Sequence, residues 1–352
     1  MAKRGELEAV AHRKEETGQS IPASFVYTVK HLTVEYPVHG VWHPALRDVS
    51  LTIEANQITA LIGESGSGKS TLVLALMNAV NAPGRIAQGT IELEDGRNVL
   101  QMKGRALQQM RGRQVGMVFQ AAQNVLNPLK KIGGQILDLG RSHGYKQPKV
   151  LLQRAAILAQ AMALDPDRVL TSYQHELSGG MRQRVSILMA LVLEPSILLL
   201  DEPTTALDVL SQSAILQIIR TVHAQHHLST VLITHDMGVV AELAQHVVVL
   251  YGGQIMETGR IIDILRAARH PYTQALIHAI PRLTGDPGKA QPLDGVPPEL
   301  ANVPVRGCVF RDRCRFHTEV CAQDTPRLQT VEAGHQVACH HWENLGGEGR
   351  YD

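Results

Sequence analysis

Residues 63–71, GESGSGKST, have the composition of a loop that binds phosphate groups. They fit the pattern G-x-x-x-x-G-K-[ST] and lie between an apolar segment that ends at Ile62 and a helix expected to begin near Lys69. Glycines let backbone N–H groups turn toward a phosphate, and the N-terminus of a helix favours negative charge. Lys69 would supply a positive charge to the β- and γ-phosphates, and Ser70 a hydroxyl for Mg²⁺. The residues predicted to contact the nucleotide here are Gly63, Ser65, Gly66, Gly68, Lys69, Ser70 and Thr71.

Two neighbouring carboxylates follow an apolar run in ILLLDEPTTALD, residues 197–208. The run predicts a buried strand that delivers Asp201 to its carboxyl end, where the side chain can hold Mg²⁺. Glu202 comes next and can orient or deprotonate an attacking water. A solvated acidic turn would explain the Asp-Glu pair alone, but the phosphate loop earlier in the chain favours nucleotide chemistry.

All four cysteines lie near the end of the chain, spaced C-x5-C-x6-C-x17-C from Cys308 to Cys339. The first residues mix both charge signs and have no apolar core, so we expect no signal peptide and a cytosolic protein with reduced thiols. Four thiolates fit tetrahedral Zn²⁺ or a 4Fe–4S cluster, with unliganded thiols as the third reading. The spacing is not the paired C-x2-C of most zinc ribbons, and it leaves the metal open.

The stretch LSGGMRQRV, residues 177–185, discriminates among proteins that carry a phosphate loop. It resembles the signature of ABC-type ATPases, in which a Ser-Gly-Gly turn binds the γ-phosphate held by a second subunit. Ser178 can cap the following helix, and Gly179 and Gly180 leave N–H groups free for an anion. Such a turn alone would be a plain helix cap, but its position shortly before ILLLDEP favours the signature.

The resemblance covers roughly residues 25–340 and implies further roles. It implies that Gln120, placed at the end of the expected strand VGMVFQ, contacts Mg²⁺ together with Ser70 and Asp201. It also implies catalytic roles for Glu202 as the base and for His235 at the γ-phosphate. The residues that match the D-loop are Ala206, Leu207 and Asp208. Tyr36 is the candidate for stacking on adenine; Trp42 and Tyr27 are alternatives, and a place in the core is the structural reading.

The spellings HELSGGMRQRV, THDMGVVAELA and HPYTQAL narrow the resemblance to the peptide/nickel/opine importer branch, of the oligopeptide and dipeptide permease ATPase type. Met181 replaces the usual Gln of the signature, as in that branch. GCVFRDRC and GHQVAC resemble the C-terminal module of the branch, which implies a 4Fe–4S cluster, with Zn²⁺ as the alternative. Its implied ligands are Cys308, Cys314, Cys321 and Cys339. We expect the metal to replace a core there, since the tail has few large apolar residues.

The implied function is ATP hydrolysis that powers an importer, with ATP and Mg²⁺ bound between this chain and a second, distinct ATPase subunit. Two membrane permease subunits and an extracytoplasmic binding protein complete the implied assembly, at the cytoplasmic face of the inner membrane. Peptides are the expected cargo, and nickel, opines or oligosaccharides are the alternatives. A soluble ABC ATPase acting on nucleic acid or ribosomes is the rival class. A net charge of +1 gives no support for binding nucleic acid.

One departure from the family pattern lies just after Gln120. The stretch AAQNVLNPL, residues 121–129, lacks the acidic residue that usually follows this glutamine. Because that segment faces the membrane subunit in the family, we expect the coupling contact to differ.

The elements that must position these residues follow from hydrophobic patterning. Short apolar strands alternate with helices from residue 57 onward, which predicts a parallel sheet covered on both faces. No apolar run reaches the roughly 18–20 residues that a membrane span needs. With the resemblance, we expect an α/β fold: a P-loop NTPase of the ABC type with a RecA-like parallel sheet, an antiparallel β subdomain, a helical subdomain and a C-terminal Cys-rich metal module.

The expected layout has four parts. They are a mobile extension over 1–22, a nucleotide-binding domain over 23–280 with its helical subdomain at about 121–183, a Pro/Gly-rich linker over 281–307, and an iron–sulfur module over 308–345.

Overall fold

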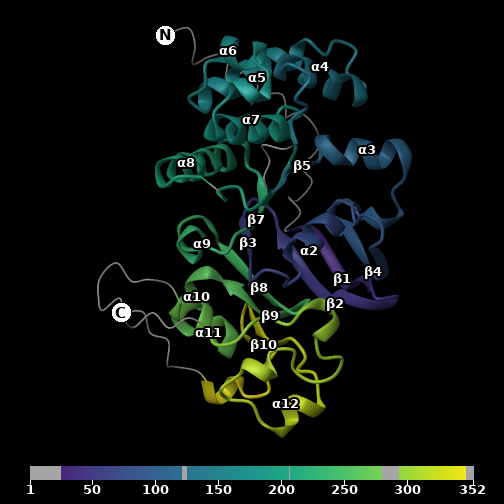
Figure 1. Ribbon diagram of the computed structural model, residues 1–352, viewed down its shortest axis with the longest axis vertical. Helices are drawn as coiled ribbons and strands as arrows, with labels where there is room; N and C mark the ends of the chain where they lie inside the picture. Colours follow the sequence, from purple (N-terminus) through teal and green to yellow (C-terminus); the bar gives the residue numbers. More distant parts are fainter. Residues whose placement is uncertain (1–24, 121–124, 206, 280–292, 346–352) are drawn as a thin grey trace.

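The computed structural model describes residues 25–120, 125–205, 207–279 and 293–345. The expected mobile extension over 1–22, Ala206 of the D-loop match and the first part of the expected linker therefore lie outside the described residues. Within them, a central sheet separates a group of helices at one end of the molecule from the C-terminal tail at the other (Figure 1).

An eight-stranded mixed sheet forms the centre of the molecule. Its order is β5 (Val115–Val118), β6 (Ile197–Asp201), β7 (Ser229–Ile233), β3 (Ile58–Ile62), β8 (His246–Tyr251), β9 (Gln254–Arg260), β11 (His335–Val337) and β10 (Gln329–Glu332). The first five strands are parallel, and the last three are antiparallel to their neighbours. Every residue of β3, β6 and β7 is buried, which confirms the predicted parallel sheet with both faces covered.

Alternate residues of the central strands belong to two different cores. In β6, Leu198 and Leu200 join the cluster on the helical side of the sheet, whereas Leu199 joins the other cluster. This follows from the period of two along a strand. The sheet is thus fixed from both faces, and the loops at the carboxyl ends of its parallel strands are free to carry chemistry.

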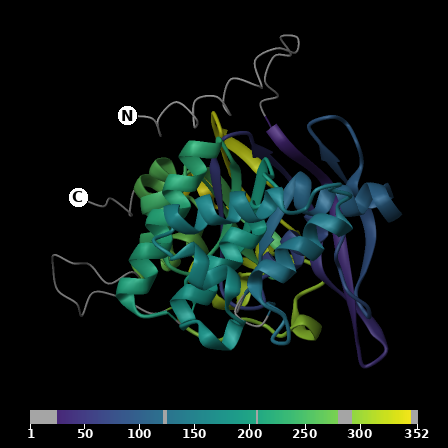
Figure 2. The same cartoon turned by 90° about the horizontal axis from the view of Figure 1, so that it is seen from above.

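A second, three-stranded antiparallel sheet has the order β2 (Val41–Glu54), β1 (Phe25–Val38) and β4 (Arg85–Leu93). Seen from above, it lies to one side of the helices (Figure 2). The alternating pattern of VSLTI, residues 49–53, predicts a strand there, and in the structure that strand, β2, begins earlier, at Val41. The reason is a two-residue turn, His39 and Gly40, with φ of 50° and 81°, which pairs Val38 with Val41.

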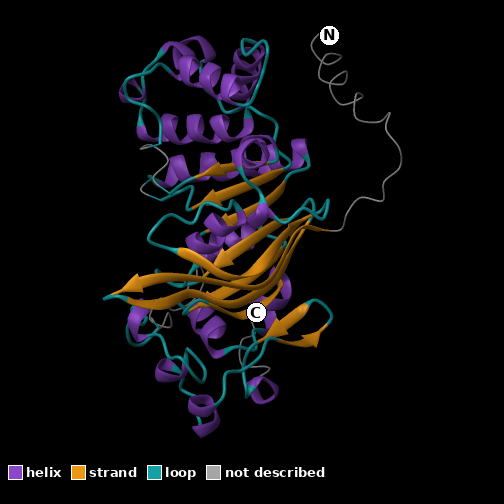
Figure 3. Ribbon diagram, turned by 90° about the vertical axis from the view of Figure 1, so that its right-hand side faces the viewer, coloured by secondary structure: helices purple, strands orange, loops and turns teal. Residues whose placement is uncertain are grey.

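The helices are α2 (Lys69–Leu76), α3 (Gly104–Arg113), α4 (Ile132–Ser142), α5 (Val150–Ala161), α6 (Pro166–Thr171), α7 (Gly179–Leu191), α8 (Val209–His226), α9 (Met237–Leu243), α10 (Ile261–Ala267), α11 (Pro271–His278) and α12 (Glu319–Gln323). Helices α4, α5 and α6 pack on one another beyond the edge of the main sheet (Figures 1 and 3).

Two local predictions were wrong. The run VLQM, residues 99–102, predicts a strand from its sequence, but Val99–Gln101 form a short 3₁₀ turn, because the Asn98 side chain accepts a hydrogen bond from the Leu100 N–H and caps it. Strand β5 ends at Val118, so Gln120 lies two residues beyond the strand rather than at its end.

The C-terminal tail shares the main core and the main sheet. Its strand β11 pairs with β9, and Val309 and Phe310 belong to the core cluster on the helical side. The Phe310 ring meets the Tyr251 ring edge-on at a centroid distance of 5.2 Å. The expectation that a metal takes the place of a hydrophobic core in the tail therefore needs correction, because apolar residues of the tail pack in the core beside the main sheet.

Candidate nucleotide site

The phosphate loop connects β3 to α2 and depends on two glycines. Gly63 has a φ of +147°, and a Cβ added there would lie 2.2 Å from the Leu250 carbonyl oxygen of β8. Gly68 caps α2 with a φ of +103°, a left-handed conformation that side chains disfavour. The loop can therefore lie tightly against β8 and still direct N–H groups outward at the start of α2.

Lys69 is buried at the start of α2. Its ammonium donates hydrogen bonds to the carbonyl oxygens of Gly63, at 2.7 Å, and Glu64, at 2.8 Å. Burial lowers the pKa of Lys69, and the nearby carboxylates of Glu202 and Asp201 act in the opposite direction. The ammonium is thus held inside the loop, at a position from which it can contact a bound phosphate.

Ser70 and Asp201 meet at the carboxyl end of β6, as the sequence predicts. The Ser70 hydroxyl donates to Asp201 Oδ1 at 3.2 Å. Burial raises the pKa of Asp201, and the hydrogen bond from Ser70 acts against that shift. A hydroxyl and a carboxylate are hard oxygen ligands of the kind that Mg²⁺ prefers, so this pair fits a magnesium ion bound beside the phosphates.

Three side chains lie around the Glu202 carboxylate, two from other segments of the chain and one from the same loop. Gln120 Nε2 donates to Glu202 Oε2 at 3.0 Å, and the Thr205 hydroxyl donates to the same oxygen at 2.8 Å. His235 Nδ1 lies 3.7 Å from Glu202 Oε1. The structure therefore brings Gln120, Glu202 and His235, to which the family resemblance assigns separate roles, close together, and adds Thr205.

The signature turn and Asp208 form a separate group. The Ser178 hydroxyl accepts a hydrogen bond from the Met181 N–H at 3.3 Å and caps α7, as predicted. Asp208 caps α8 by accepting from the Ser211 N–H at 2.9 Å. A Cβ added to Gly180 would lie 3.3 Å from Ser211 Oγ, which places the signature turn beside the start of α8. Ser178 and Asp208 thus each cap their own helix, and Gly180 brings the start of α7 beside the start of α8.

Four other residues predicted to contact the nucleotide are Ser65, Gly66, Thr71 and Gly179. Ser65 is exposed on the phosphate loop, Gly66 has a φ of +78°, and Thr71 lies half-buried in the first turn of α2. Gly179 is the first residue of α7, with open space around it.

Tyr36, the candidate for stacking on adenine, lies half-buried on β1 against Gly84, where a Cβ would approach its ring to 2.4 Å. Tyr36 pairs with His43 on strand β2. Two residues further along β2, the carbonyl oxygen of Ala45 lies next to Gly68 of the phosphate loop. Of the alternatives, Tyr27 is fully buried and Trp42 is stacked under the Arg85 guanidinium at 3.9 Å.

The four cysteines line one small cavity, which His340 and His341 also border. Burial raises the pKa of Cys308 to about 12 and that of Cys339 to about 11, and the neighbouring thiols add to both shifts. Over the ranges that the structure describes, no group of three or more His, Cys, Asp or Glu side chains could hold a metal ion. The structure thus gathers the predicted thiols but does not itself support the metal module.

Three residues near the phosphate loop were not predicted from the sequence. The Glu64 N–H donates to the Tyr272 hydroxyl at 2.8 Å, and the Glu64 carboxylate pairs with Arg313. The only signals available were the occurrence of Tyr272 in the branch motif HPYTQAL and of Arg313 beside Cys314.

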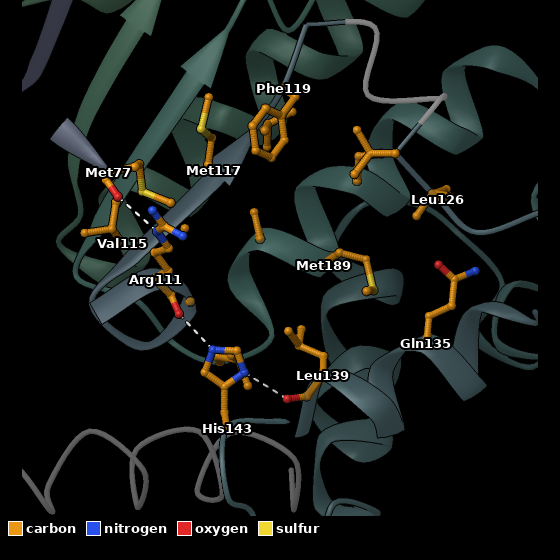
Figure 4. Close-up of a pocket in the computed structure, with 17 residues that line it drawn as sticks. Met77, Arg111, Val115, Met117, Phe119, Leu126, Gln135, Leu139, His143 and Met189 are labelled. Atoms are coloured by element: carbon orange, nitrogen blue, oxygen red, sulfur yellow. Dashed lines mark hydrogen bonds between the residues drawn. The ribbon is translucent and has the colours of Figure 1, made fainter. Parts of the chain in front are cut away.

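An apolar cavity of about 300 Å³ lies between β5, α4 and α7, and Phe119, the residue before Gln120 in the chain, lines it (Figure 4). Its lining includes Met77, Val115, Met117, Phe119, Val125, Leu126, Leu139 and Met189. His143 closes one side, with its two ring nitrogens within 2.7 Å of the Arg111 carbonyl oxygen and 2.9 Å of the Leu139 carbonyl oxygen. Val125 in this lining is 57% exposed, so the apolar surface continues to the outside.

None of the helices described here has both the length and the apolar character that crossing a bilayer requires.

Comparisons with known proteins agree with this geometry. Residues 46–205 match the family model "ABC transporter", and residues 256–321 match "Oligopeptide/dipeptide transporter, C-terminal region". The dipeptide transport ATP-binding protein DppD of Caldanaerobacter subterraneus subsp. tengcongensis is 38% identical over 91% of this chain and 98% of its own length. DppD of Escherichia coli is 36% identical over 89% of this chain and 95% of its own. A bacterial ABC transporter cassette solved as a dimer superposes with a TM-score of 0.58 at 26% identity, over 67% of this chain and 98% of that one.

Proposed function

The chain belongs to the ABC transporter family of ATPases, among the dipeptide transport ATP-binding proteins, and we propose that it hydrolyses ATP to power the import of peptides. The observation that carries the proposal is the arrangement around Glu202. Its carboxylate is held by Gln120 and Thr205, next to the Ser70–Asp201 pair and within reach of His235. Such an arrangement suits the transfer of a phosphoryl group to water.

The residues of this chain would divide the work as follows. Ser70 and Asp201 would hold Mg²⁺, which would neutralise part of the phosphate charge. Lys69 would exchange its carbonyl partners for phosphate oxygens. Glu202 would orient the attacking water and accept its proton, and His235 would stabilise the charge on the transferred group.

The second half of the ATP site would come from another ATPase subunit. The signature turn at Ser178 caps α7 and lies beside the start of α8, and we infer that it would complete a partner's ATP site rather than its own. The dimeric cassette with a similar fold supports this arrangement. By the family resemblance, the partner is a distinct ATPase, and an extracytoplasmic binding protein delivers the cargo.

The apolar cavity that Phe119 lines would receive an apolar helix of a membrane permease subunit. Its walls are largely methionine, valine and leucine, and exposed Val125 extends it outward. Helix-in-groove binding uses such surfaces. With Gln120 joined to Glu202, movement of the bound helix would reach the catalytic carboxylate. This would place the chain as a peripheral protein on the inner face of the membrane.

The 4Fe–4S cluster also belongs to this proposal. The four thiols border one cavity and the matched oligopeptide/dipeptide transporter region includes three of the four cysteines, but the described residues as they stand form no group that could hold a metal ion. Cluster assembly would require the thiols to lose their protons and the cavity to widen. We expect iron and sulfide, rather than zinc, in chain purified without oxygen. Zinc without sulfide would establish the alternative. If the purified chain contained neither iron nor zinc, the proposal of a metal site would be overturned.

Uptake by cells tests the function directly. Cells that carry Glu202→Gln should lose uptake of labelled di- and oligopeptides, while the purified variant still binds Mg·ATP. Glu94→Gln, the same change at an exposed turn, is the matched control and should transport normally. Labelled nickel is measured in parallel. Loss of nickel uptake with intact peptide uptake would overturn the assignment of cargo, and wild-type ATP turnover in Glu202→Gln would overturn the role of the base.

A further inference from the structure

The cysteine-containing tail contacts the phosphate loop through one arginine. Arg313 Nη1 lies 2.5 Å from Glu64 Oε2, and Arg313 Nη2 lies 3.1 Å from Glu64 Oε1. This is a bidentate pair between a guanidinium and a carboxylate, the geometry that gives such pairs their strength and direction. Glu64 is the second residue of the phosphate loop, so the tail contacts the ATP site directly.

The arginine is fixed by its own surroundings. Its side chain is only 6% exposed. Nε donates to the Asp294 carbonyl oxygen at 2.8 Å, and Nη2 donates to the Gly295 carbonyl oxygen at 3.2 Å. Nη1 also lies 3.3 Å from the Tyr251 hydroxyl. Because the guanidinium is held by these neighbours, it can hold Glu64 in turn rather than follow it.

Glu64 is held at three points. Its N–H donates to the Tyr272 hydroxyl, its carbonyl oxygen accepts from the Lys69 ammonium, and its carboxylate binds Arg313. A shift of the side chain would therefore move the carbonyl that orients Lys69. Without Arg313, the Glu64 carboxylate would also place an uncompensated negative charge beside the site for the γ-phosphate, where it would repel ATP.

We infer that Arg313 is a positioning residue of the ATP site, which sets the affinity of the phosphate loop for Mg·ATP through Glu64. The inference rests on the proposed function, since it requires ATP at this loop. As a positioning residue, Arg313 contacts neither the attacking water nor the phosphates of ATP. Its effect should therefore appear in nucleotide binding, whereas the chemical step, which depends on Glu202, should be spared.

The test is a double-mutant cycle on the full-length chain. We expect Arg313→Gln to raise the Kd for Mg·ATP at least about fivefold. In the assembled transporter it should raise KM in parallel, with kcat within about twofold of the wild type. Adding Glu64→Gln to Arg313→Gln removes the uncompensated charge and should restore most of the affinity. Arg313→Lys, which keeps the charge but not the bidentate geometry, should lie between.

Arg311→Gln is the matched control. Arg311 lies in the same short turn and donates to the Arg306 carbonyl oxygen within the tail, not to the phosphate loop. An equal rise in Kd for Arg311→Gln would overturn the inference, because general damage to the tail would then explain both. An unchanged Kd for Arg313→Gln, or no recovery in the double variant, would also overturn it. If the wild-type chain failed to bind Mg·ATP, the proposed function itself would fall.

Discussion

At the scale of single residues, the backbone at Glu202 is unusual. Its φ is +47°, a left-handed conformation that costs a non-glycine residue on the order of 1–3 kcal/mol. The surroundings maintain it, since the Glu202 N–H donates to the Ile233 carbonyl oxygen at 3.1 Å and the carboxylate accepts from Gln120 and Thr205. The strained backbone thus turns the side chain away from β6 and toward the residues with which it would act.

Thr205 should assist catalysis by orienting Glu202. Thr205→Val keeps the shape of the side chain but removes the hydroxyl that donates to Glu202 Oε2. We expect kcat to fall about tenfold, with KM within about twofold of the wild type, because the carboxylate loses one of its two orienting donors. Steady-state ATPase assays of the assembled transporter measure both constants. Thr204→Val, the same change one residue earlier, should leave both near wild type; an equal loss there would contradict the role of Thr205.

His270 should make the fold sensitive to acid. Burial lowers its pKa to about 4, and its Nδ1 accepts from the Tyr272 N–H as the cap of α11. Because the folded pKa lies below the ordinary value of about 6.5, the unfolded chain binds the proton first as the pH falls. The free energy of unfolding should therefore drop between about pH 6.5 and pH 4, by up to about 1.4 kcal/mol per pH unit.

The measurement is urea unfolding at about pH 7 and about pH 5, for the wild type and His270→Asn. Asparagine can also cap a helix, but it does not titrate. The variant should lose less stability between the two pH values than the wild type does. Equal losses would show that other groups cause the acid sensitivity.

At the scale of elements, the tail is an extension of the main sheet. Strand β11 pairs with β9, and buried Glu257 of β9 accepts from His335 Nε2 at 2.7 Å and from the N–H groups of Arg269 and His270. One buried carboxylate therefore joins the tail to the segment that leads into α11. Such a group is stable inside a protein only when it is hydrogen-bonded, as it is here.

Phe310 should contribute strongly to the stability of the whole chain, because it packs in the main hydrophobic core rather than in a separate core of the tail. It is 2% exposed and packs against Tyr251, Tyr272 and His270. Phe310→Ala should lower the free energy of unfolding by about 3–5 kcal/mol, measured by urea denaturation. Phe316→Ala is the control, because that ring is only partly buried beside a small cluster. Equal losses for the two variants would contradict the shared core.

At the scale of the whole molecule, the predicted ATP-binding groups lie in two places. Lys69, Asp201 and Glu202 lie together at the carboxyl ends of the central strands, whereas Ser178 lies at the start of α7 beside α8. Under the proposed function, the phosphate loop and the signature turn of one chain would therefore serve different ATP molecules, and a dimer would bring the two halves together.

Ser178→Arg should separate binding from hydrolysis. The bulky charged side chain would block the partner's ATP site, so ATPase activity of the assembled transporter should fall at least about tenfold. The Kd for Mg·ATP of the isolated chain should stay near wild type, because the phosphate loop is elsewhere. Ser196→Arg is the control, because Ser196 lies just before β6, at the end of that strand away from Asp201. A higher Kd for Mg·ATP in Ser178→Arg would instead place Ser178 in the ATP site of its own subunit.

The sequence by itself determined the features that depend on local spacing. These are the phosphate loop, the buried strand that ends at Asp201, the cap at Ser178 and the alternation of apolar strands with helices, because each follows from identities within about ten residues and from the period of the backbone. Tyr36 shows the limit: its residue type suits a nucleotide contact, and only the structure places its ring beside Gly84. The roles of the predicted site residues stay predictions.

Only the tertiary structure decided which distant segments meet. Gln120 reaches Glu202 across 82 residues, and Arg313 reaches Glu64 across 249. The tail joins the sheet at β9, which the spacing of its cysteines did not indicate. Contacts of this kind depend on how whole elements pack, and many pairings of a short tail are compatible with the same local pattern. The physical reason is that local propensity restricts the conformation of each segment, whereas burial and hydrogen bonding across the core select its partner.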